Sequence, residues 1–241
     1  MPIERIVQPI PELADSFASL VEDACREASL ESRAVSLALP GGSVARSFFP
    51  RLTRLRLDWR RVLVFFGDER AVASDHPEAN LRLARELWLD HVPIPLANVH
   101  RIRGERPDLD SAAREYEAVL RSSLGDPPRL DIALLGMGPD GHVCSLFPGH
   151  PALEETERYV VPVLDAPKPP RGRITLTLLA IAAARTVVVA AFGEGKAEMA
   201  RDAIENAASR RPAARALRAG PRALALLDPP AAARLAPVPR V

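Results

Sequence analysis

Residues 136–142 give the sharpest functional signal in the chain, with Asp140 and His142 placed among glycines. The apolar run 132–135 comes directly before them, which is typical of a buried strand that ends in a loop. A histidine has an ordinary pKa of about 6.5, so His142 can take a proton from water near neutral pH. Asp140 can fix the tautomer of that ring or bind a substrate. We predict a catalytic loop with His142 as general base, the alternative being a histidine that caps the following helix.

A second loop has the composition of an anion-binding turn. Pro40, Gly41, Gly42 and Ser43 follow an apolar run and precede a short predicted helix at residues 44–49. Glycines let backbone N–H groups approach a ligand closely, and a helix N-terminus favours negative charge. We predict that Gly41, Gly42 and Ser43 hold a phosphate. The alternative is a tight turn in which Ser43 caps the helix.

Three cationic side chains are candidates to bind the same anion. Arg70 ends a Gly-Asp-Glu-Arg turn, where it can contact a phosphate and Asp68 can orient neighbouring groups or sugar hydroxyls. Lys196 stands at the start of a predicted helix, which opposes the helix dipole and suggests an anionic partner. Arg173 begins a threonine-rich run, and Asn80 precedes or opens another helix. The alternatives are a solvated turn for Asp68 and Arg70, and an exposed helix lysine for Lys196. For Arg173 the alternative is a surface ion pair, and for Asn80 a helix cap.

The segments that must position these residues alternate between strand-like and helix-like patterns. Short apolar runs that end at glycine-containing turns predict buried parallel strands at residues 35–39, 62–66, 132–135 and 187–192. Helical spacing of apolar residues, or placement after such a turn, predicts helices at residues 12–30, 44–49, 79–89, 112–124 and 197–206, with Pro50 ending or kinking the second. Residues 173–178 should form an antiparallel or edge strand, and residues 223–227 are strand-like. The pattern predicts an α/β fold with a mainly parallel, doubly wound sheet, helices on both faces and ligands outside the carboxyl ends of the strands.

Composition limits the classes of function that remain. The 241 residues, 47% hydrophobic, suit one domain covering residues 1–241. A net charge of +1 gives no basic surface for nucleic acid or for an anionic membrane. Two distant cysteines, no signal-like N-terminus and no apolar run long enough to span a bilayer predict a cytoplasmic protein. No metal-ligand spacing is present, so we expect neither a metal nor an organic cofactor.

Taken together, the loops resemble those of the glucosamine-6-phosphate isomerase/6-phosphogluconolactonase family, and most closely its lactonase branch. The motifs keep their order along nearly the whole chain. They are Leu39-Pro40-Gly41-Gly42-Ser43, Gly67-Asp68-Glu69-Arg70, Gly136-Met137-Gly138-Pro139-Asp140-Gly141-His142, Ser145-Leu146-Phe147-Pro148-Gly149 and Arg173-Ile174-Thr175-Leu176-Thr177.

The resemblance implies a Rossmann-like fold and hydrolysis of a phosphorylated sugar lactone to 6-phosphogluconate, in the oxidative pentose phosphate pathway. It implies His142 as base, a phosphate held by the glycine turn with Arg70 and Lys196, and Arg173 as a further substrate contact. The expected partner is this small molecule alone, with the protein a monomer or small homo-oligomer. The chain departs from the family pattern at Ala79, where lactonases typically have serine, and in lacking a tryptophan before Leu227-Asp228.

Two other functions share these features. A glucosamine-6-phosphate deaminase has the same Asp-Gly-His loop, but that branch usually has an aromatic residue at the position of Arg70. It also usually reads Asn-Glu-Pro where this chain has Ser145-Leu146-Phe147-Pro148. A regulator that only binds a sugar phosphate would normally add a DNA-binding helix-turn-helix, for which the chain has neither spare length nor basic charge.

Overall fold

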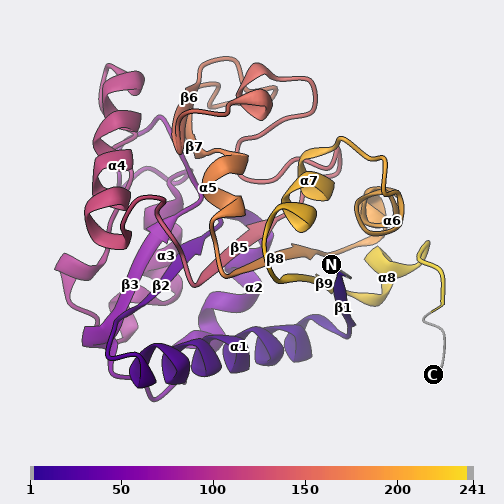
Figure 1. Ribbon diagram of the computed structural model, residues 1–241, viewed down its shortest axis with the longest axis horizontal. Helices are drawn as coiled ribbons and strands as arrows, with labels where there is room; N and C mark the ends of the chain where they lie inside the picture. The colour runs from indigo at the N-terminus through magenta and orange to yellow at the C-terminus, as the bar shows by residue number, and fades with distance from the viewer. Residues whose placement is uncertain (1–2, 238–241) are drawn as a thin grey trace.

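The centre of the molecule is a six-stranded sheet in which every neighbouring pair of strands is parallel. The computed structural model describes residues 3–237. The strand order is β1-β9-β8-β5-β2-β3, which places β1 at one edge and β3 at the other (Figure 1). The strands are β1 (Glu4–Val7), β2 (Val35–Leu39), β3 (Val62–Phe66), β5 (Ile132–Gly136), β8 (Thr186–Ala191) and β9 (Ala223–Leu227).

Helices cover both faces of this sheet. The long α1 (Ile10–Leu30) and α2 (Gly42–Leu52) pack together on one face, while α5 (Leu178–Ala182) and α7 (Pro212–Ala219) lie on the other (Figure 1). The remaining helices pack around these: α3 (Asn80–Leu87), α4 (Leu109–Leu124), α6 (Ala197–Glu205) and α8 (Pro229–Ala232). Short 3-10 helices occur at Trp59–Arg61, Leu89–His91, Leu96–Asn98, Pro151–Glu154 and Glu194–Lys196. No helix within residues 3–237 is long and apolar enough to cross a membrane.

Burial on both sides explains the near-continuous apolar sequences of the inner strands. All residues of β2, β8 and β9 are buried, as expected for a parallel sheet sandwiched between helices. Aromatic residues fill the space between this sheet and α1 and α2: Phe17 stacks on Phe48 with ring centroids 5.4 Å apart, and Phe48 contacts Phe192. This packing fixes α2, whose first turn carries the glycine loop.

A second, three-stranded antiparallel sheet stands beside the carboxyl ends of the main sheet. It has the order β4-β7-β6 and consists of β4 (Asp68–Arg70), β7 (Arg173–Leu176) and β6 (Val160–Val163). Asp68 pairs with Thr175, and Arg70 pairs with Arg173. The Asp-Glu-Arg segment is therefore held in an extended conformation, in which Asp68 and Arg70 point to one side and Glu69 to the other.

The α/β class, the mainly parallel sheet and the helices on both faces are confirmed. The segment 173–178 is antiparallel as predicted, but its strand ends at Leu176 because α5 begins at Leu178, with Thr177 as its N-cap. The prediction that Pro50 ends or kinks the helix at residues 44–49 was wrong about its end, since α2 continues to Leu52. Only two residues of the helix follow Pro50. The backbone hydrogen bond that Pro50 cannot donate would lie near the end of the helix, where few further hydrogen bonds depend on it. Strands β1, β4 and β6 were not predicted, because none is a continuous apolar run: β1 and β4 contain charged residues, and β6 includes Pro162.

Candidate functional site

The predicted site residues converge on one cavity of about 140 Å³ at the carboxyl ends of the main strands. Eight of the ten predicted residues line it: Gly41, Gly42, Ser43, Asp68, Arg70, Asn80, His142 and Lys196. Asp140 lies behind His142, and Arg173 does not line the cavity. The loops come from strands β2, β5 and β8 and from β4 of the second sheet, so Gly41 and Lys196, 155 positions apart in the sequence, meet here.

The glycine turn presents the start of α2 to the cavity. Gly41 is the N-cap residue, and Gly42 has φ of 69°, a conformation that favours glycine. A side chain at Gly41 would overlap Asn80, since a Cβ there would lie 1.9 Å from Asn80 Oδ1. The first N–H groups of a helix have no acceptor within it, and the first turn of α2 contains no acidic residue. The turn can therefore receive an anion. The alternative that Ser43 caps the helix was wrong, because Ser43 lies inside α2.

Asp68 is a buried carboxylate held by two neighbours. Its Oδ2 accepts a 2.7 Å hydrogen bond from Ser145 Oγ, and its Oδ1 accepts one of 3.2 Å from Asn80 Nδ2. Asn80 Nδ2 also donates to the backbone oxygen of Asp68 at 2.9 Å. The fully buried Ser145, three residues after His142, was not among the predicted site residues. It fixes Asp68 in the orientation in which the carboxylate can accept hydrogen bonds from a ligand.

Glu69 points away from the cavity and supports the residues that line it. Its Oε1 accepts hydrogen bonds from the backbone N–H of Asn80 and of Arg70, and its Oε2 accepts one from Leu81. The N-cap residue of α3, Ala79, has no side-chain oxygen, so this buried carboxyl satisfies the start of the helix instead. Burial raises the pKa of Glu69 to about 7, although the three N–H donors act in the opposite direction.

Two cations complete the polar lining. Arg70 donates from Nη1 to the backbone oxygen of Glu78 at 2.7 Å, while its Nε is buried without a hydrogen-bond partner among residues 3–237. Lys196 ends a 3-10 turn and is the N-cap residue of α6. Burial lowers the pKa of Lys196, and the nearby charge of Asp228 opposes that effect. Both side chains have unsatisfied donor capacity that an anion can use.

His142 and Asp140 form a hydrogen-bonded pair. His142 Nδ1 lies 2.5 Å from Asp140 Oδ1, and the backbone N–H of His142 donates to the same oxygen at 3.2 Å. Burial acts to raise the pKa of Asp140, but the charge of His142 and these hydrogen bonds lower it below its ordinary value. An ionised Asp140 requires Nδ1 to be the donor, which leaves the Nε2 lone pair of a neutral ring available. Nε2 has no hydrogen-bond partner within the described chain.

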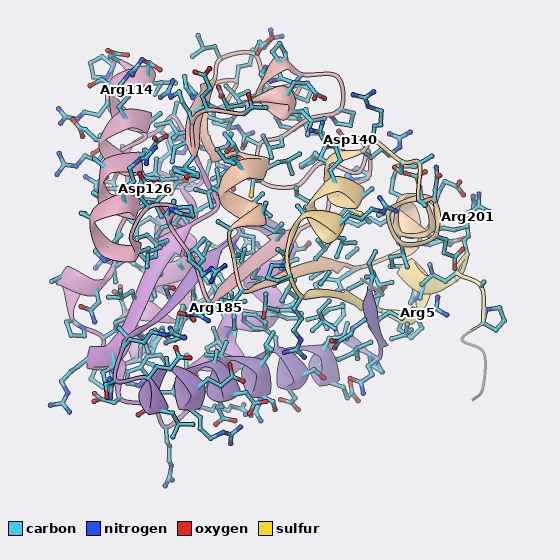
Figure 2. All side chains as sticks on the ribbon, viewed as in Figure 1. Arg5, Arg114, Asp126, Asp140, Arg185 and Arg201 are labelled. Carbon is cyan, nitrogen blue, oxygen red and sulfur yellow. The ribbon has the colours of Figure 1, made fainter. Side chains whose placement is uncertain are left out.

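The imidazole ring is also fixed by close packing. Phe147 lies against one side, with ring centroids 4.9 Å apart. Gly138 lies so near that a Cβ there would be 2.1 Å from His142 Cε1. Asp140 is on the side of the molecule where α7 lies (Figure 2), and Arg211, the N-cap residue of that helix, donates to the Asp140 backbone oxygen at 3.2 Å. The loop therefore has little freedom to reorient the ring.

Arg173 has a different environment from the one predicted. Its guanidinium donates to the backbone oxygen of Pro170 at 2.7 Å and to that of Lys168 at 3.3 Å. Burial, together with the positive charge of Arg70, lowers its pKa. These contacts hold the proline-rich loop between β6 and β7. The structure does not bring Arg173 into the cavity, so a direct substrate contact has no support in its placement.

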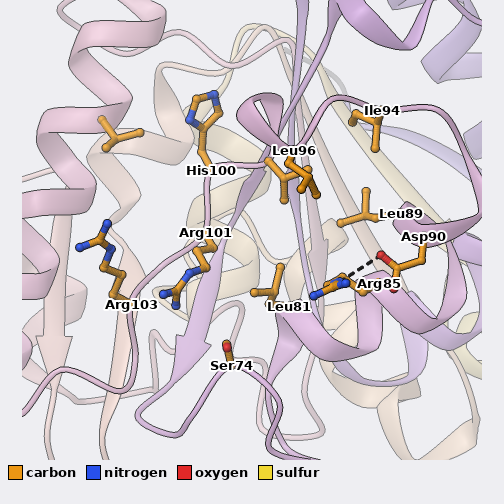
Figure 3. A pocket seen from close by; sticks show the side chains of 12 residues that line it. Ser74, Leu81, Arg85, Leu89, Asp90, Ile94, Leu96, His100, Arg101 and Arg103 are labelled. Carbon is orange, nitrogen blue, oxygen red and sulfur yellow. Dashed lines mark hydrogen bonds and ion pairs between the residues drawn. The ribbon is translucent and has the colours of Figure 1, made fainter.

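A larger pocket of about 460 Å³, lined in part by Leu81 and Arg85 of α3, contains His100 but neither the glycine turn nor a histidine hydrogen-bonded to a carboxylate (Figure 3). Its apolar side chains include Leu81 and Leu89, and its arginines have acidic partners. Arg85 contacts Asp90 at 3.0 Å, and Arg101 contacts Glu105 at 2.7 Å. No group of three or more His, Cys, Asp or Glu side chains able to hold a metal ion occurs among residues 3–237. Size alone therefore does not identify the functional site here.

Comparison with known proteins gives consistent matches. The profile of the glucosamine-6-phosphate isomerase/6-phosphogluconolactonase family matches residues 10–224. The chain is 48% identical over 159 residues to 6-phosphogluconolactonase of Mycobacterium tuberculosis, a match covering 63% of this chain and 64% of that protein. It is 41% identical to human 6-phosphogluconolactonase over 81% of this chain and 78% of the human one.

Solved structures agree in fold. 6-Phosphogluconolactonase from Trypanosoma brucei superimposes with a TM-score of 0.85 at 29% identity, covering 98% of this chain and 99% of that one. A monomeric glucosamine-6-phosphate deaminase reaches a TM-score of 0.81 at 24% identity, over 97% of this chain and 99% of its own. The fold is thus common to proteins named for two different reactions, and the choice between them depends on the residues of the cavity.

Proposed function

Because this chain belongs to the glucosamine-6-phosphate isomerase/6-phosphogluconolactonase family, we propose that it hydrolyses 6-phospho-D-glucono-1,5-lactone to 6-phosphogluconate. The observation that carries the proposal is the meeting, in one cavity, of an anion-binding helix start, two cations and a histidine whose Nδ1 is paired with a carboxylate. The first two features suit a phosphate, and the third suits the activation of water.

In this proposal the phosphate binds at the start of α2. The backbone N–H groups of Gly42 and Ser43 donate to it, and Arg70 and Lys196 supply positive charge. Each of these groups contacts a part of the substrate that does not react, so the binding energy serves to place C1 of the lactone near His142. The carboxylate of Asp68, fixed by Ser145, accepts hydrogen bonds from sugar hydroxyl groups.

His142 Nε2 then takes a proton from a water molecule as the water oxygen attacks C1. Asp140 keeps the proton on Nδ1 and stabilises the imidazolium that forms, as expected for a carboxylate hydrogen-bonded to the far nitrogen. The tetrahedral intermediate collapses by breaking the bond between C1 and the ring oxygen, which receives the proton from Nε2. The products are the C1 carboxylic acid and a free hydroxyl group. Acid–base help of this kind is typically worth about 10²- to 10⁴-fold in rate.

The deciding experiment is a lactonase assay on the purified protein. The lactone is generated in situ, 6-phosphogluconate is followed through a coupled dehydrogenase, and spontaneous hydrolysis is subtracted. We expect acceleration by the wild type and its loss in the folded His142→Ala variant. A wild-type rate equal to the blank would refute the proposal, and ammonia release from glucosamine 6-phosphate would then be measured.

A further inference from the structure

Asp228 is a buried carboxylate directly behind the turn that carries Lys196. It is 8% exposed and follows the last residue of β9. In the parallel register Leu227 pairs with Ala191, so Asp228 stands beside the residues that leave β8 and lead to Lys196. The position is fixed by the sheet and does not depend on a flexible loop.

Both oxygens of Asp228 bind the backbone of this turn. Gly193 N–H lies 2.9 Å from Oδ1 and 3.0 Å from Oδ2, and Ala231 N–H donates to Oδ1 at 2.9 Å. Gly193 has φ of 89°, so the chain reverses there in a conformation that favours glycine. The carboxylate therefore holds the start of the Gly193–Lys196 turn and, through Ala231, the start of α8.

Asp228 also supplies negative charge close to Lys196. No arginine or lysine forms an ion pair with Asp228 in the part of the chain that the structure describes. Lys196 is partly buried, and Asp228 is the charged group that most opposes the effect of burial on its ammonium. The other charged groups around Lys196 are Glu194 on the same turn and, lining the cavity with it, Asp68, Arg70 and His142.

We propose that Asp228 is a positioning residue for phosphate binding: it fixes the turn that presents Lys196 and balances the Lys196 charge while the cavity is empty. This inference rests on the proposed role of Lys196 in holding the substrate phosphate. Asp228 itself does not line the cavity, so it acts through Lys196 and touches no reacting atom.

The test compares Asp228→Asn, which retains an oxygen acceptor but loses the charge, with Asp228→Ala, which loses both. Binding of 6-phosphogluconate is measured by calorimetry between pH 7 and pH 9, and KM and kcat are measured for the lactone at pH 7. D228A should raise Kd and KM about tenfold with a much smaller change in kcat, since a hydrogen bond to a charged group is lost. D228N should have a small effect at pH 7 that grows with pH, because Lys196 then loses its proton at lower pH.

Two controls separate this role from general destabilisation. Asp131 is a similarly buried carboxylate that accepts hydrogen bonds from Ser36 at the opposite, amino end of the strands. Asp131→Asn should lower the melting temperature without changing KM or Kd. In a Lys196→Ala background, D228N should add no further, pH-dependent loss of affinity.

An unchanged Kd in D228A would overturn the inference. So would a pH-dependent loss of affinity in D228N that is equal in the wild-type and Lys196→Ala backgrounds. These results are distinguishable from failure of the proposed reaction. A wild type that binds 6-phosphogluconate but does not accelerate lactone hydrolysis would refute the reaction alone. A wild type that binds no 6-phosphogluconate would overturn the phosphate site and this inference together.

Discussion

Replacing Gly138 by alanine should displace His142, the proposed general base. The added Cβ would lie 2.1 Å from His142 Cε1, 2.2 Å from Nδ1 and 2.8 Å from Nε2. Non-bonded carbon atoms settle at about 3.5–4.0 Å, so the ring must retreat by roughly 1.4 Å. Phe147 packs against the ring with 4.9 Å between centroids and is itself buried, so the ring has little room to move. The retreat therefore stretches the hydrogen bond between Nδ1 and Asp140.

The expected cost is large for a change of one methyl group. A misplacement of about 1 Å at a reacting group can lower the rate about 10²-fold, equivalent to about 2.7 kcal/mol in the activation barrier. We expect kcat/KM of G138A to fall by that factor in the coupled lactonase assay. The Kd for 6-phosphogluconate should change far less, because Gly138 lies beside His142 and is not one of the groups proposed to donate hydrogen bonds to the phosphate.

Gly125 provides the matched control. It has φ of 87° and no atom within 4 Å of an added Cβ, so Gly125→Ala strains the backbone without contacting another residue. G125A should lose about 1–3 kcal/mol of stability, because its backbone lies in a region that is essentially restricted to glycine, and it should keep its activity. In addition, G138A should cause no further loss in a H142A background. A folded G138A protein with the wild-type kcat/KM would refute the argument that close packing positions the ring.

Substitutions of the other site residues should have separate effects on kcat, on KM and on stability. His142→Asn should lower kcat about 10²- to 10⁴-fold because the base is lost. Asp140→Asn should also lower kcat strongly, because an amide permits the other tautomer of the His142 ring. An unchanged kcat in either variant would contradict the mechanism. Arg70→Ala and Lys196→Ala should each raise KM about 10- to 100-fold with a smaller effect on kcat. A decrease in kcat with unchanged KM would refute their proposed role in phosphate binding. Folding raises the pKa of Glu69 from 4.5 to about 7. The protonated side chain therefore contributes to the free energy of unfolding in full below pH 4.5, and this contribution is lost as the pH rises through 7. In denaturant titrations across that window, unfolding free energy should fall with pH more steeply in the wild type than in Glu69→Gln, and equal slopes would refute the assignment.

The side chains proposed to do the chemistry could be identified from the sequence because their types are unusual in ordinary turns. Asp140 and His142 stand among glycines after an apolar run, and the glycine turn at residues 41–43 follows another. Parallel strands buried on both faces are apolar throughout, and their loops must meet at one edge of the sheet. The α/β class and eight of the cavity residues were therefore predictable from local pattern and topology.

Supporting residues could not be found in this way, because their roles depend on neighbours that are distant in the sequence. Glu69 satisfies N–H groups of Asn80 and Leu81, and Ser145 donates to Asp68 across 77 positions. Arg173 has the charge expected of a phosphate ligand, and its pairing with Arg70 places both side chains on the same face of the antiparallel pair, yet its guanidinium donates to the backbone oxygen of Pro170.

The sequence alone thus determined which residues can carry charge, accept a proton or let the backbone approach a ligand, since these are properties of residue type and of local conformation. The tertiary structure decided which of them share a cavity, which way each hydrogen bond runs, and which charges are buried. Those outcomes depend on strand order, register and packing between distant segments. Arg173 shows the consequence, because its guanidinium donates to a loop carbonyl and does not line the cavity.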